Sequence, residues 1–466
     1  MYETELIFDY AKEPSRDILC IDCKSFYASV ECVRRGLHPL ETKLVVMSYP
    51  SADPKERGSG LILASSPAAK KAYGISNISR ARDLPFPYPP GLVIAAPQMR
   101  LYMQKNTEIN NIYKKYADEA NHHVYSVDES FVDITGAQKL FGKSSAYEMA
   151  KLIQADVLQT TGIYTTIGIG DNPLLAKLAL DNAAKHQPDM IAEWRYPDIP
   201  ETVWKIPDMT DFWGIGKRTK LRLNRLGIFS IYDLAHTNYY YLKSQLGVMG
   251  AQLYAHSWGI DRSFLGEKVK VSSKSIGNSQ VLNKDYVVRS EIEIVLIEMA
   301  DQVATRLRKS GAKTQLVSLS IGYSINYIDQ LGRTGFHQQL KIPPTNASSE
   351  LVTHILMIFD QHYKDQSIRN VGVGAGNLIY TDFLQLDLFQ EPDEQVNEQK
   401  KDLIVDSIRK KYGFRSLVRA VSLLEGGRAI ARSSLVGGHA GGMAGLEEGE
   451  ENAERYRTEV RTSFGG

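Results

Sequence analysis

Acidic residues stand at the ends of apolar stretches in two distant parts of this sequence. Asp22 closes the run Ile18–Ile21, and the pair Asp128-Glu129 lies inside the apolar stretch Tyr125–Ile134. These patterns predict buried strands that meet at carboxylates. If the strands share one sheet, three acids converge, and acids share a small volume only when protons or cations neutralise them. The spacing therefore indicates a divalent-cation site.

Carboxylates without companion histidines select hard ions such as Mg²⁺, which takes further ligands from waters and substrate phosphates. The predicted chemistry is phosphoryl or nucleotidyl transfer. For any single acid a structural role is the plainer explanation: Asp22 would cap the following helix, for which Ser25 is the expected N-cap, and Asp128-Glu129 would be a solvated turn. The combination of the three acids favours catalysis.

The stretches around these acids resemble the catalytic signatures of Y-family, translesion DNA polymerases. They read Asp22-Cys23-Lys24-Ser25-Phe26-Tyr27-Ala28-Ser29-Val30-Glu31 and Ser126-Val127-Asp128-Glu129-Ser130-Phe131. The agreement in order and spacing continues from Ile18 to Phe389 and is greatest with the bacterial UmuC-like branch. The resemblance implies an error-prone DNA polymerase that joins dNTPs to a primer 3′-hydroxyl in DNA damage bypass and the SOS response.

The resemblance also implies roles for the acids. Asp22 and Asp128 would bridge two Mg²⁺ ions, and Glu129 would complete the site that activates the 3′-hydroxyl. A backbone carbonyl near Cys23 would ligate the second ion. Asp133, beyond the hairpin, is expected to be structural.

Four side chains are expected to contact the nucleotide by the same resemblance. Tyr27 matches the steric gate, whose ring fills the space that a 2′-hydroxyl needs, and Phe26 would pack beside the nucleotide or in the core. Lys71 and Lys185 match positions that reach the triphosphate, although Lys71 could be a solvated helix lysine. Lys177 is expected to be structural or to face DNA.

The predicted fold class is α+β, in a multidomain right-hand polymerase. Strand, helix, strand, strand, helix, strand around the acidic ends predicts a ferredoxin-like palm. The resemblance adds small fingers, a helix-hairpin-helix thumb and an α+β little finger. The expected boundaries are an N-terminal extension at 1–16, palm at 17–39 and 80–200, fingers at 40–79, thumb at 201–264, a linker at 265–272, little finger at 273–384 and a C-terminal tail at 390–466.

Two stretches are expected to bind primer–template DNA. Gly214-Ile215-Gly216 would place backbone N–H groups at a helix start, where a DNA phosphate is favoured, and Lys217, Arg218 and Lys220 follow directly. The likeness of Phe212–Ile228 to a helix-hairpin-helix supports this. In the little finger, Lys274-Ser275-Ile276-Gly277 begins the strands that would track the duplex backbone.

Residues Gln385-Leu386-Asp387-Leu388-Phe389 match the pentapeptide that binds the bacterial sliding clamp, the DNA polymerase III beta subunit. Leu388 and Phe389 would anchor in an apolar pocket, with Gln385 and Leu386 supporting them. The alternative is a last strand packed on its own domain. Asp402–Leu424 has a helical, amphipathic pattern, and the glycine- and glutamate-rich end beyond it is expected to be flexible.

Composition is that of an ordinary globular protein of 466 residues with a net charge of +1. No apolar run suits a bilayer and no signal peptide is expected, so we expect a soluble, cytoplasmic protein without membrane partners. Cys20-x-x-Cys23 lacks further ligands for zinc, and buried thiols are the better explanation for these residues and Cys32.

Two other classes of function remain open. A palm with paired acids could belong to a nucleotidyl cyclase, although a helix-hairpin-helix and a clamp peptide argue against one. A non-catalytic, clamp-bound scaffold is the other, and Asp22, Asp128, Glu129 and Lys185 argue against it. A recombinase filament and a UmuD-like subunit are further partners that the resemblance suggests.

Overall fold

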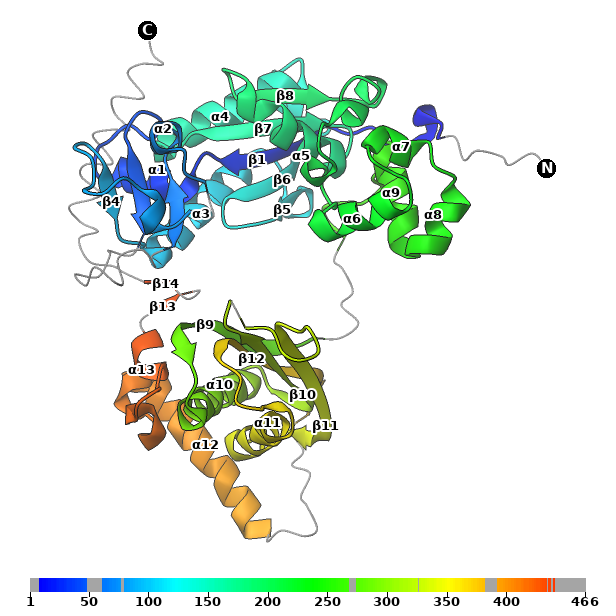
Figure 1. The fold of residues 1–466 in the computed structure, drawn as a ribbon. Coiled ribbons are helices and arrows are strands. Elements are labelled where there is room, and N and C mark those ends of the chain that lie inside the picture. Colours follow the sequence, from blue (N-terminus) through cyan, green and yellow to red (C-terminus); the bar gives the residue numbers. More distant parts are fainter. Residues whose placement is uncertain are drawn as a thin grey trace. The chain divides into compact units, whose positions relative to one another are not determined.

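The computed structural model describes residues 8–47, 61–76, 79–267, 274–325, 327–381 and 392–433, and the backbone of two short strands at 435–436 and 439–440. The chain divides into two compact units, residues 1–268 with 440–466 and residues 269–439. The fold is α+β, as predicted (Figure 1). Within the described residues, no helix has the length and apolarity needed to cross a bilayer.

The first unit is built on a five-stranded sheet with the order β5-β6-β1-β7-β8. The central strand β1 (Ile18–Cys23) is antiparallel to β6 (Glu129–Asp133) and to β7 (Thr165–Gly170). β5 (His122–Val124) extends the β6 edge, and β8 (Ile191–Trp194) lies parallel to β7. The apolar run predicted to be a buried strand is therefore the middle of the sheet, where both faces are covered.

Side chains of β1 alternate between two cores, as strand geometry requires. Leu19, Ile21 and Cys23 join the larger core with α1 (Phe26–Arg34), α3 (Met99–Tyr113) and α4 (Ala146–Thr161). Ile18 and Cys20 point to the opposite face, where they meet Ala176 and Leu180 of α5 (Pro173–Asn182). Asp22 follows the second set by the same alternation, so its carboxylate belongs to the α5 side of the sheet.

The glycines of β7 allow α5 to approach this closely. A Cβ on Gly168 would lie 2.1 Å from the carbonyl oxygen of Ala176, and one on Gly170 would lie 2.4 Å from the Ala176 nitrogen. Both contacts are shorter than a side chain tolerates. Glycine at both positions therefore allows this close packing.

The predicted fingers are a small unit on the edge of this fold. The strands β2 (Leu44–Met47), β3 (Ile62–Ser65) and β4 (Val93–Ala95) form a sheet in the order β3-β2-β4. β4 lies in the range 80–200 that was predicted as palm, but it pairs in parallel with β2 and so extends this sheet beyond the predicted fingers. Helix α2 (Pro67–Tyr73) starts at Ser66, whose hydroxyl accepts from the Ala69 N–H, and ends at Gly74 with φ of +63°. The αL conformation is one that glycine adopts without strain, and it closes the helix.

Four helices follow the sheet: α6 (Lys217–Arg225), α7 (Ile231–Ala235), α8 (Tyr239–Leu246) and α9 (Val248–Ser257). Their core is shared with the outer side of α5, through Leu174, Leu175 and Leu178. Figure 1 shows them as the green bundle beside the sheet. The shared core fixes this predicted thumb to the same helix that covers the acidic strand ends.

Residues 8–17, for which the sequence carried no recognisable pattern, bind the sheet and the helical bundle together, and we call them the N-terminal clasp. Tyr10 stacks on Tyr196 with ring centroids 5.0 Å apart, and its hydroxyl donates to the carbonyl of Trp258 at 3.2 Å. Glu13 accepts from Arg262 of the bundle at 2.7 Å, while Ser15 donates to Asp171 at the end of β7 at 2.7 Å.

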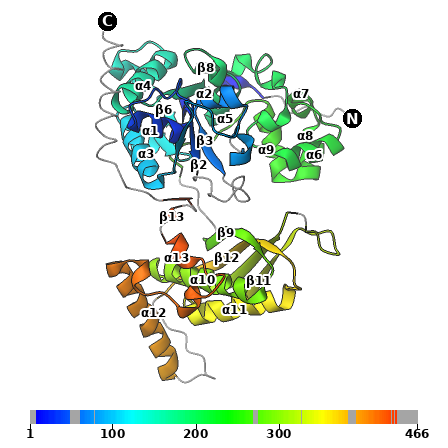
Figure 2. The ribbon, with the colours of Figure 1, turned by 60° about the vertical axis from the view of Figure 1, so that its left-hand side comes forward.

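The second unit is a four-stranded antiparallel sheet with the order β11-β10-β12-β9. Its strands are β9 (Ile276–Tyr286), β10 (Ala312–Tyr323), β11 (Gly335–Thr345) and β12 (Ile368–Tyr380). Helices α10 (Arg289–Lys309) and α11 (Ser348–His362) pack on one side of the sheet (Figure 2).

Residues 392–433, predicted as part of a C-terminal tail, form structure that packs on α10. Helix α12 (Pro392–Tyr412) is followed by short helical turns at 414–416 and 420–423 and by α13 (Ala429–Arg432). Arg308 of α10 binds Asp402 at 2.9 Å and Asp406 at 2.6 Å. The predicted helix Asp402–Leu424 is thus misplaced, because Gly413, with φ of +88°, ends α12.

Two local predictions need correction. Ser25 occupies the N-cap position of α1, but it has φ of +48° and its side chain makes no capping hydrogen bond. The stretch Tyr125–Val127, expected to be strand, belongs to the turn between β5 and β6, in which the N–H groups of Tyr125 and Ser126 both donate to the Glu129 carbonyl. Asp128 therefore stands on a turn, not on a strand.

Candidate active site

The three acids predicted to be catalytic come together at one end of β1 and β6. Asp22 and Glu129 are direct partners in the antiparallel register of these strands, so their side chains project from the same face. The N–H of Cys23 donates to the carbonyl of Asp128 at 2.9 Å, which ties the turn to β1. The Ser126 hydroxyl donates to the Asp128 carboxylate at 2.8 Å.

The proximity of these acids changes their chemistry. The pKa of Asp22 is raised to about 6, first by burial, with the charge of Lys185 lowering it and the charges of Asp128 and Glu129 raising it. A carboxyl with this pKa is partly protonated near neutrality unless positive charge stabilises its anion. The site therefore has a deficit of positive charge of the kind that a divalent cation removes.

Two lysines of the α5 side supply part of that charge. Lys185 lies 3.2 Å from Asp22 and 2.7 Å from Asp181. Lys177 lies 2.7 Å from Glu129 and 3.0 Å from the other oxygen of Asp181. Lys177 is only 8% exposed, so the expectation that it faces DNA is wrong. Asp181 was not among the predicted site residues. Its i, i+4 spacing from both lysines is the pattern that favours ion pairs on one face of a helix.

Glu129 has a further partner inside the sheet. The thiol of Cys20 donates to Glu129 Oε1 at 3.0 Å, and this is the same oxygen that binds Lys177. All three cysteines are buried and free, as predicted. Burial first, and then the charge of Glu129, raise the pKa of the Cys20 thiol, so it remains a hydrogen-bond donor.

The donor set suits Mg²⁺ in chemistry, since it consists of carboxylates and backbone carbonyls. Within the described residues, however, no three acidic, imidazole or thiol side chains already surround one point as metal ligands. The ammonium groups of Lys177 and Lys185 stand against two of the acids instead. A cation can therefore bind only after these lysines give way.

The predicted steric gate lies on the first turn of α1. Tyr27 is half-buried and stacks on Tyr102 of α3, with ring centroids 4.4 Å apart and planes 16° from parallel. The Tyr102 hydroxyl donates to Glu31 at 2.7 Å. Phe26 is 2% exposed and belongs to the palm core, which was the alternative to its placement in the nucleotide site. Its ring centroid lies 5.7 Å from the ring centroid of Tyr27.

On α2, two adjacent lysines differ in their surroundings. Lys71 is exposed, and its contact with a triphosphate stays a prediction. Lys70 is half-buried, and its pKa is lowered by burial first and then by the charge of Lys185, while Asp22 raises it. Lys70 is thus the α2 lysine whose charge interacts with that of Asp22, and no local pattern predicted this.

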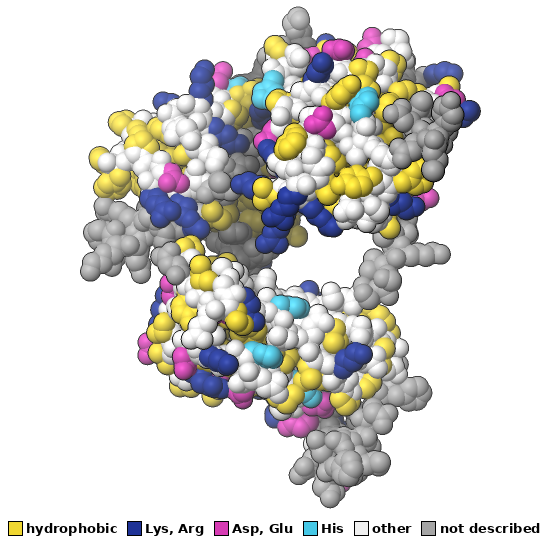
Figure 3. All heavy atoms as spheres, turned by 45° about the vertical axis from the view of Figure 1, so that its right-hand side comes forward, with side chains coloured by type: hydrophobic (Ala, Val, Ile, Leu, Met, Phe, Trp, Pro, Cys, Tyr) yellow, Lys and Arg dark blue, Asp and Glu magenta, His cyan; other side chains and the backbone are white. Residues whose placement is uncertain are grey.

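The predicted helix-hairpin-helix has the expected local form. Gly214 has φ of +101°, which a side chain rarely tolerates, and Gly216 is the N-cap of α6. Lys217 and Arg218 are exposed at the start of the helix, but Lys220 is bound by Asp208 at 2.8 Å. In the face drawn in Figure 3, Lys and Arg side chains gather along the lower edge of the first unit.

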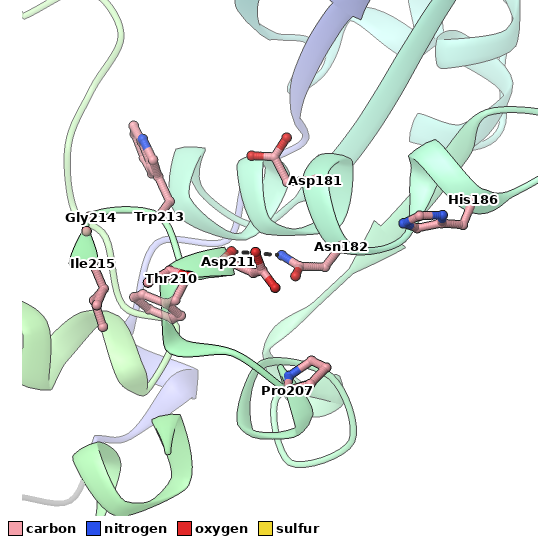
Figure 4. Close-up of a pocket in the computed structure, with 11 residues that line it drawn as sticks. Asp181, Asn182, His186, Pro207, Thr210, Asp211, Trp213, Gly214 and Ile215 are labelled. Carbon is pink, nitrogen blue, oxygen red and sulfur yellow. Dashed lines mark hydrogen bonds between the residues drawn. The ribbon is translucent and has the colours of Figure 1, made fainter. Parts of the chain in front are cut away.

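The hairpin turn borders a cavity of about 760 Å³ whose other wall is the end of α5 (Figure 4). Asp181 and Asn182 line it from α5, and Trp213 and Gly214 line it from the turn. The Trp213 indole donates to the Tyr125 hydroxyl at 3.3 Å. This contact places the turn beside the β5–β6 hairpin that carries the acids.

The remaining predicted contacts lie in or near the second unit. Lys274 and Ser275 are exposed just before β9, which is an edge strand, and Gly277 is the second residue of that strand. Their contact with DNA stays a prediction. The pentapeptide Gln385–Phe389 lies outside the described residues.

Comparison with known proteins agrees with this arrangement. Residues 21–181 match the impB/mucB/samB family, and residues 273–388 match the C-terminal domain of the same family. The chain is 40% identical over 434 residues to the UvrX protein of Bacillus subtilis (strain 168), whose name describes a UV-damage repair protein, covering 93% of this chain and 100% of that one. It is 34% identical over 426 residues to DNA polymerase IV 2 of the same organism, covering 91% and 98%.

A solved structure supports the fold. A chimeric Y-family DNA polymerase superposes with a TM-score of 0.60 at 20% identity, covering 78% of this chain and 100% of that one. At this identity the likeness concerns the fold alone.

Proposed function

The chain belongs to the impB/mucB/samB family, the UmuC-like branch of the Y-family DNA polymerases, and we propose from its site that it performs translesion synthesis with two Mg²⁺ ions. As a member of this family it is a DNA-directed DNA polymerase. The observation that carries the proposal is the convergence of three acids. Asp128 lies on the turn between β5 and β6, Glu129 begins β6, and Asp22 lies on the facing end of β1.

Each residue has a role that its position supports. Asp22, Asp128 and Glu129 would hold the ions, with a carbonyl near Cys23, and bound Mg²⁺ would activate the 3′-hydroxyl and stabilise charge on the phosphates. Lys185 would turn from Asp22 toward the triphosphate. Tyr27, held by its stack on Tyr102, would stand against the sugar.

Primer extension with Asp128→Ala tests the proposal. Asp128 is the informative choice because Asp22 and Glu129 each bind a lysine, so their loss would leave a half-buried cation without that partner. The matched control is Asp133→Asn, an acid on the same strand pair away from the turn. We expect extension to disappear in Asp128→Ala while primer–template binding remains, since affinity comes mainly from phosphate contacts.

The same assay separates the other classes of function. A cyclase would convert nucleotide without primer, and a scaffold would bind DNA but extend nothing. Extension by Asp128→Ala near the parent rate would refute the metal assignment.

We further propose a cytoplasmic enzyme of the SOS response that works with the sliding clamp and with a recombinase filament or UmuD-like subunit. Survival of a deletion strain after ultraviolet irradiation tests the role in the SOS response.

A further inference from the structure

Helix α5 and the short turn after it carry a ladder of alternating charge, formed by Lys177, Asp181 and Lys185. These residues are four apart, so they share one face of the helical segment. The two oxygens of Asp181 are divided between the lysines: Oδ1 lies 2.7 Å from Lys185 and Oδ2 lies 3.0 Å from Lys177. A single carboxylate thus holds two ammonium groups.

Each lysine of the ladder also contacts one catalytic acid. Lys177 stands between Asp181 and Glu129, and Lys185 stands between Asp181 and Asp22. The side chains of Lys177 and Glu129 are only 10% and 11% exposed. A buried ammonium that leaves one carboxylate needs another, because an unpaired charge in such a place is costly.

This arrangement has a consequence for cation binding. An ammonium on Asp22 or Glu129 repels a divalent cation and occupies oxygens that the cation needs. Asp181 is the carboxylate that already touches both lysines, so it can retain them when the acids turn to a cation. Asp181 also adds a negative charge beside the site, which favours cation binding.

We propose that Asp181 is a positioning residue that draws Lys177 and Lys185 off the catalytic acids and so permits divalent cations to bind. The proposal rests on the proposed function, since it assigns the acids as cation ligands. A purely structural alternative is that Asp181 only stabilises the end of α5.

The test is Asp181→Asn, which keeps the size of the side chain and removes its charge. Binding of Mn²⁺ is measured by electron paramagnetic resonance on the full chain bound to a dideoxy-terminated primer–template, so no turnover is needed. We expect the Mn²⁺ dissociation constant to rise about tenfold, the usual scale for partners of metal ligands. The Mg²⁺ concentration for half-maximal single-turnover extension should rise in parallel, with the rate recovering at saturating Mg²⁺.

Two variants serve as controls. Asp156→Asn removes the same charge from another lysine-paired aspartate of the palm, 3.0 Å from Lys115, and should leave Mn²⁺ binding unchanged. Asp181→Glu keeps the charge and should stay closer to the parent than Asp181→Asn. A structural role would lower the extension rate equally at every Mg²⁺ concentration.

Equal Mn²⁺ dissociation constants in the parent and Asp181→Asn would overturn the proposed role of Asp181. An equal loss of Mn²⁺ affinity in Asp156→Asn would overturn it as well. Failure of the proposed function looks different. In that case the parent would show no saturable Mn²⁺ binding, or Asp128→Ala would bind Mn²⁺ as the parent does.

Discussion

One carboxylate oxygen of Glu129 already accepts from two donors, the Lys177 ammonium and the Cys20 thiol. Both groups hold this side chain in place, and the Lys177 ammonium must leave that oxygen before a cation can use it. Glu129 is thus oriented by groups on α5 and inside β1, while the Asp128 carboxylate accepts from Ser126 of its own turn. At the scale of the residue, the acids differ in how firmly they are held.

Tyr27→Ala should admit ribonucleotides. The ring is held flat against Tyr102, so its removal opens space beside the sugar instead of letting the ring move aside. The ratio of kcat/KM for dNTP over the matching rNTP should fall by at least tenfold in single-nucleotide kinetics. The control is Tyr164→Phe, which removes a hydroxyl bound to His38 elsewhere in the unit. Unchanged sugar discrimination in Tyr27→Ala would refute the steric-gate assignment.

At the scale of the element, the N-terminal clasp joins parts that the family match does not connect. The matched region begins at residue 21, so the clasp lies before it. Its contacts reach β7 through Ser15 and the helical bundle through Tyr10 and Glu13. The clasp therefore fixes the predicted thumb to the predicted palm by contacts outside their shared core.

Tyr10→Ala should loosen this junction. It removes the stack on Tyr196 and the hydrogen bond to the Trp258 carbonyl, which together are worth about 2 kcal/mol. We expect faster amide hydrogen exchange in α9 and a lower urea midpoint. Tyr240→Ala is the matched control, since that tyrosine of α8 is 64% exposed. Equal exchange in the two variants would show that the clasp adds nothing.

Residues 392–433, which we call the C-terminal layer, are held to α10 mainly by ion pairs. Asp301 binds Arg409 at 2.9 Å and Arg419 at 2.8 Å, and its side chain is 8% exposed. Burial alone raises the pKa of Asp301, but the two guanidinium groups outweigh it and lower the pKa below its ordinary value. A lowered carboxyl pKa means stability that is present above the unfolded pKa and lost as pH falls through the folded one.

Asp301→Asn should destabilise the second unit at about pH 7 by about 2 kcal/mol, because it leaves two arginines without their buried partner. The difference from the parent should begin to shrink as the pH falls below about 4, where the carboxyl of the unfolded chain becomes protonated, and should be lost once the pH falls through the lowered pKa of the folded protein. Calorimetry across this pH range measures both effects. Asp360→Asn, whose side chain is 56% exposed and pairs with Arg289, should change little. A pH-independent difference would contradict the ionic account.

At the scale of the whole molecule, the chain is two compact units with nearly balanced charge, and the predicted clamp peptide belongs to the second. β12 ends at Tyr380 and α12 begins at Pro392, and both pack within that unit. The predicted clamp peptide is therefore followed along the chain by helical structure at 392–433 that packs on α10, where a C-terminal tail was predicted. A clamp bound there would raise the local concentration of the enzyme at the primer end.

Leu388→Ala with Phe389→Ala should weaken clamp binding more than tenfold, since anchor residues of this kind usually contribute about 2 kcal/mol or more each. Basal extension should match the parent, because the active site lies in the other unit. Surface plasmon resonance and clamp-stimulated extension measure the two effects. Asp387→Ala, directly before the two anchors, is the control. Full stimulation of the double variant would return the peptide to an ordinary connecting segment.

The sequence by itself determined the acidic ends and the buried strand before Asp22, because each depends on local pattern or on a short motif. The tertiary structure alone decided which residues meet those acids. Lys177 reaches Glu129, and Asp181 holds Lys177 there, because β1 alternates its side chains and the β7 glycines bring α5 within contact. The contacts of the N-terminal clasp and of the C-terminal layer could not be predicted from the sequence either. They join residues more than a hundred positions apart, where no sequence periodicity operates.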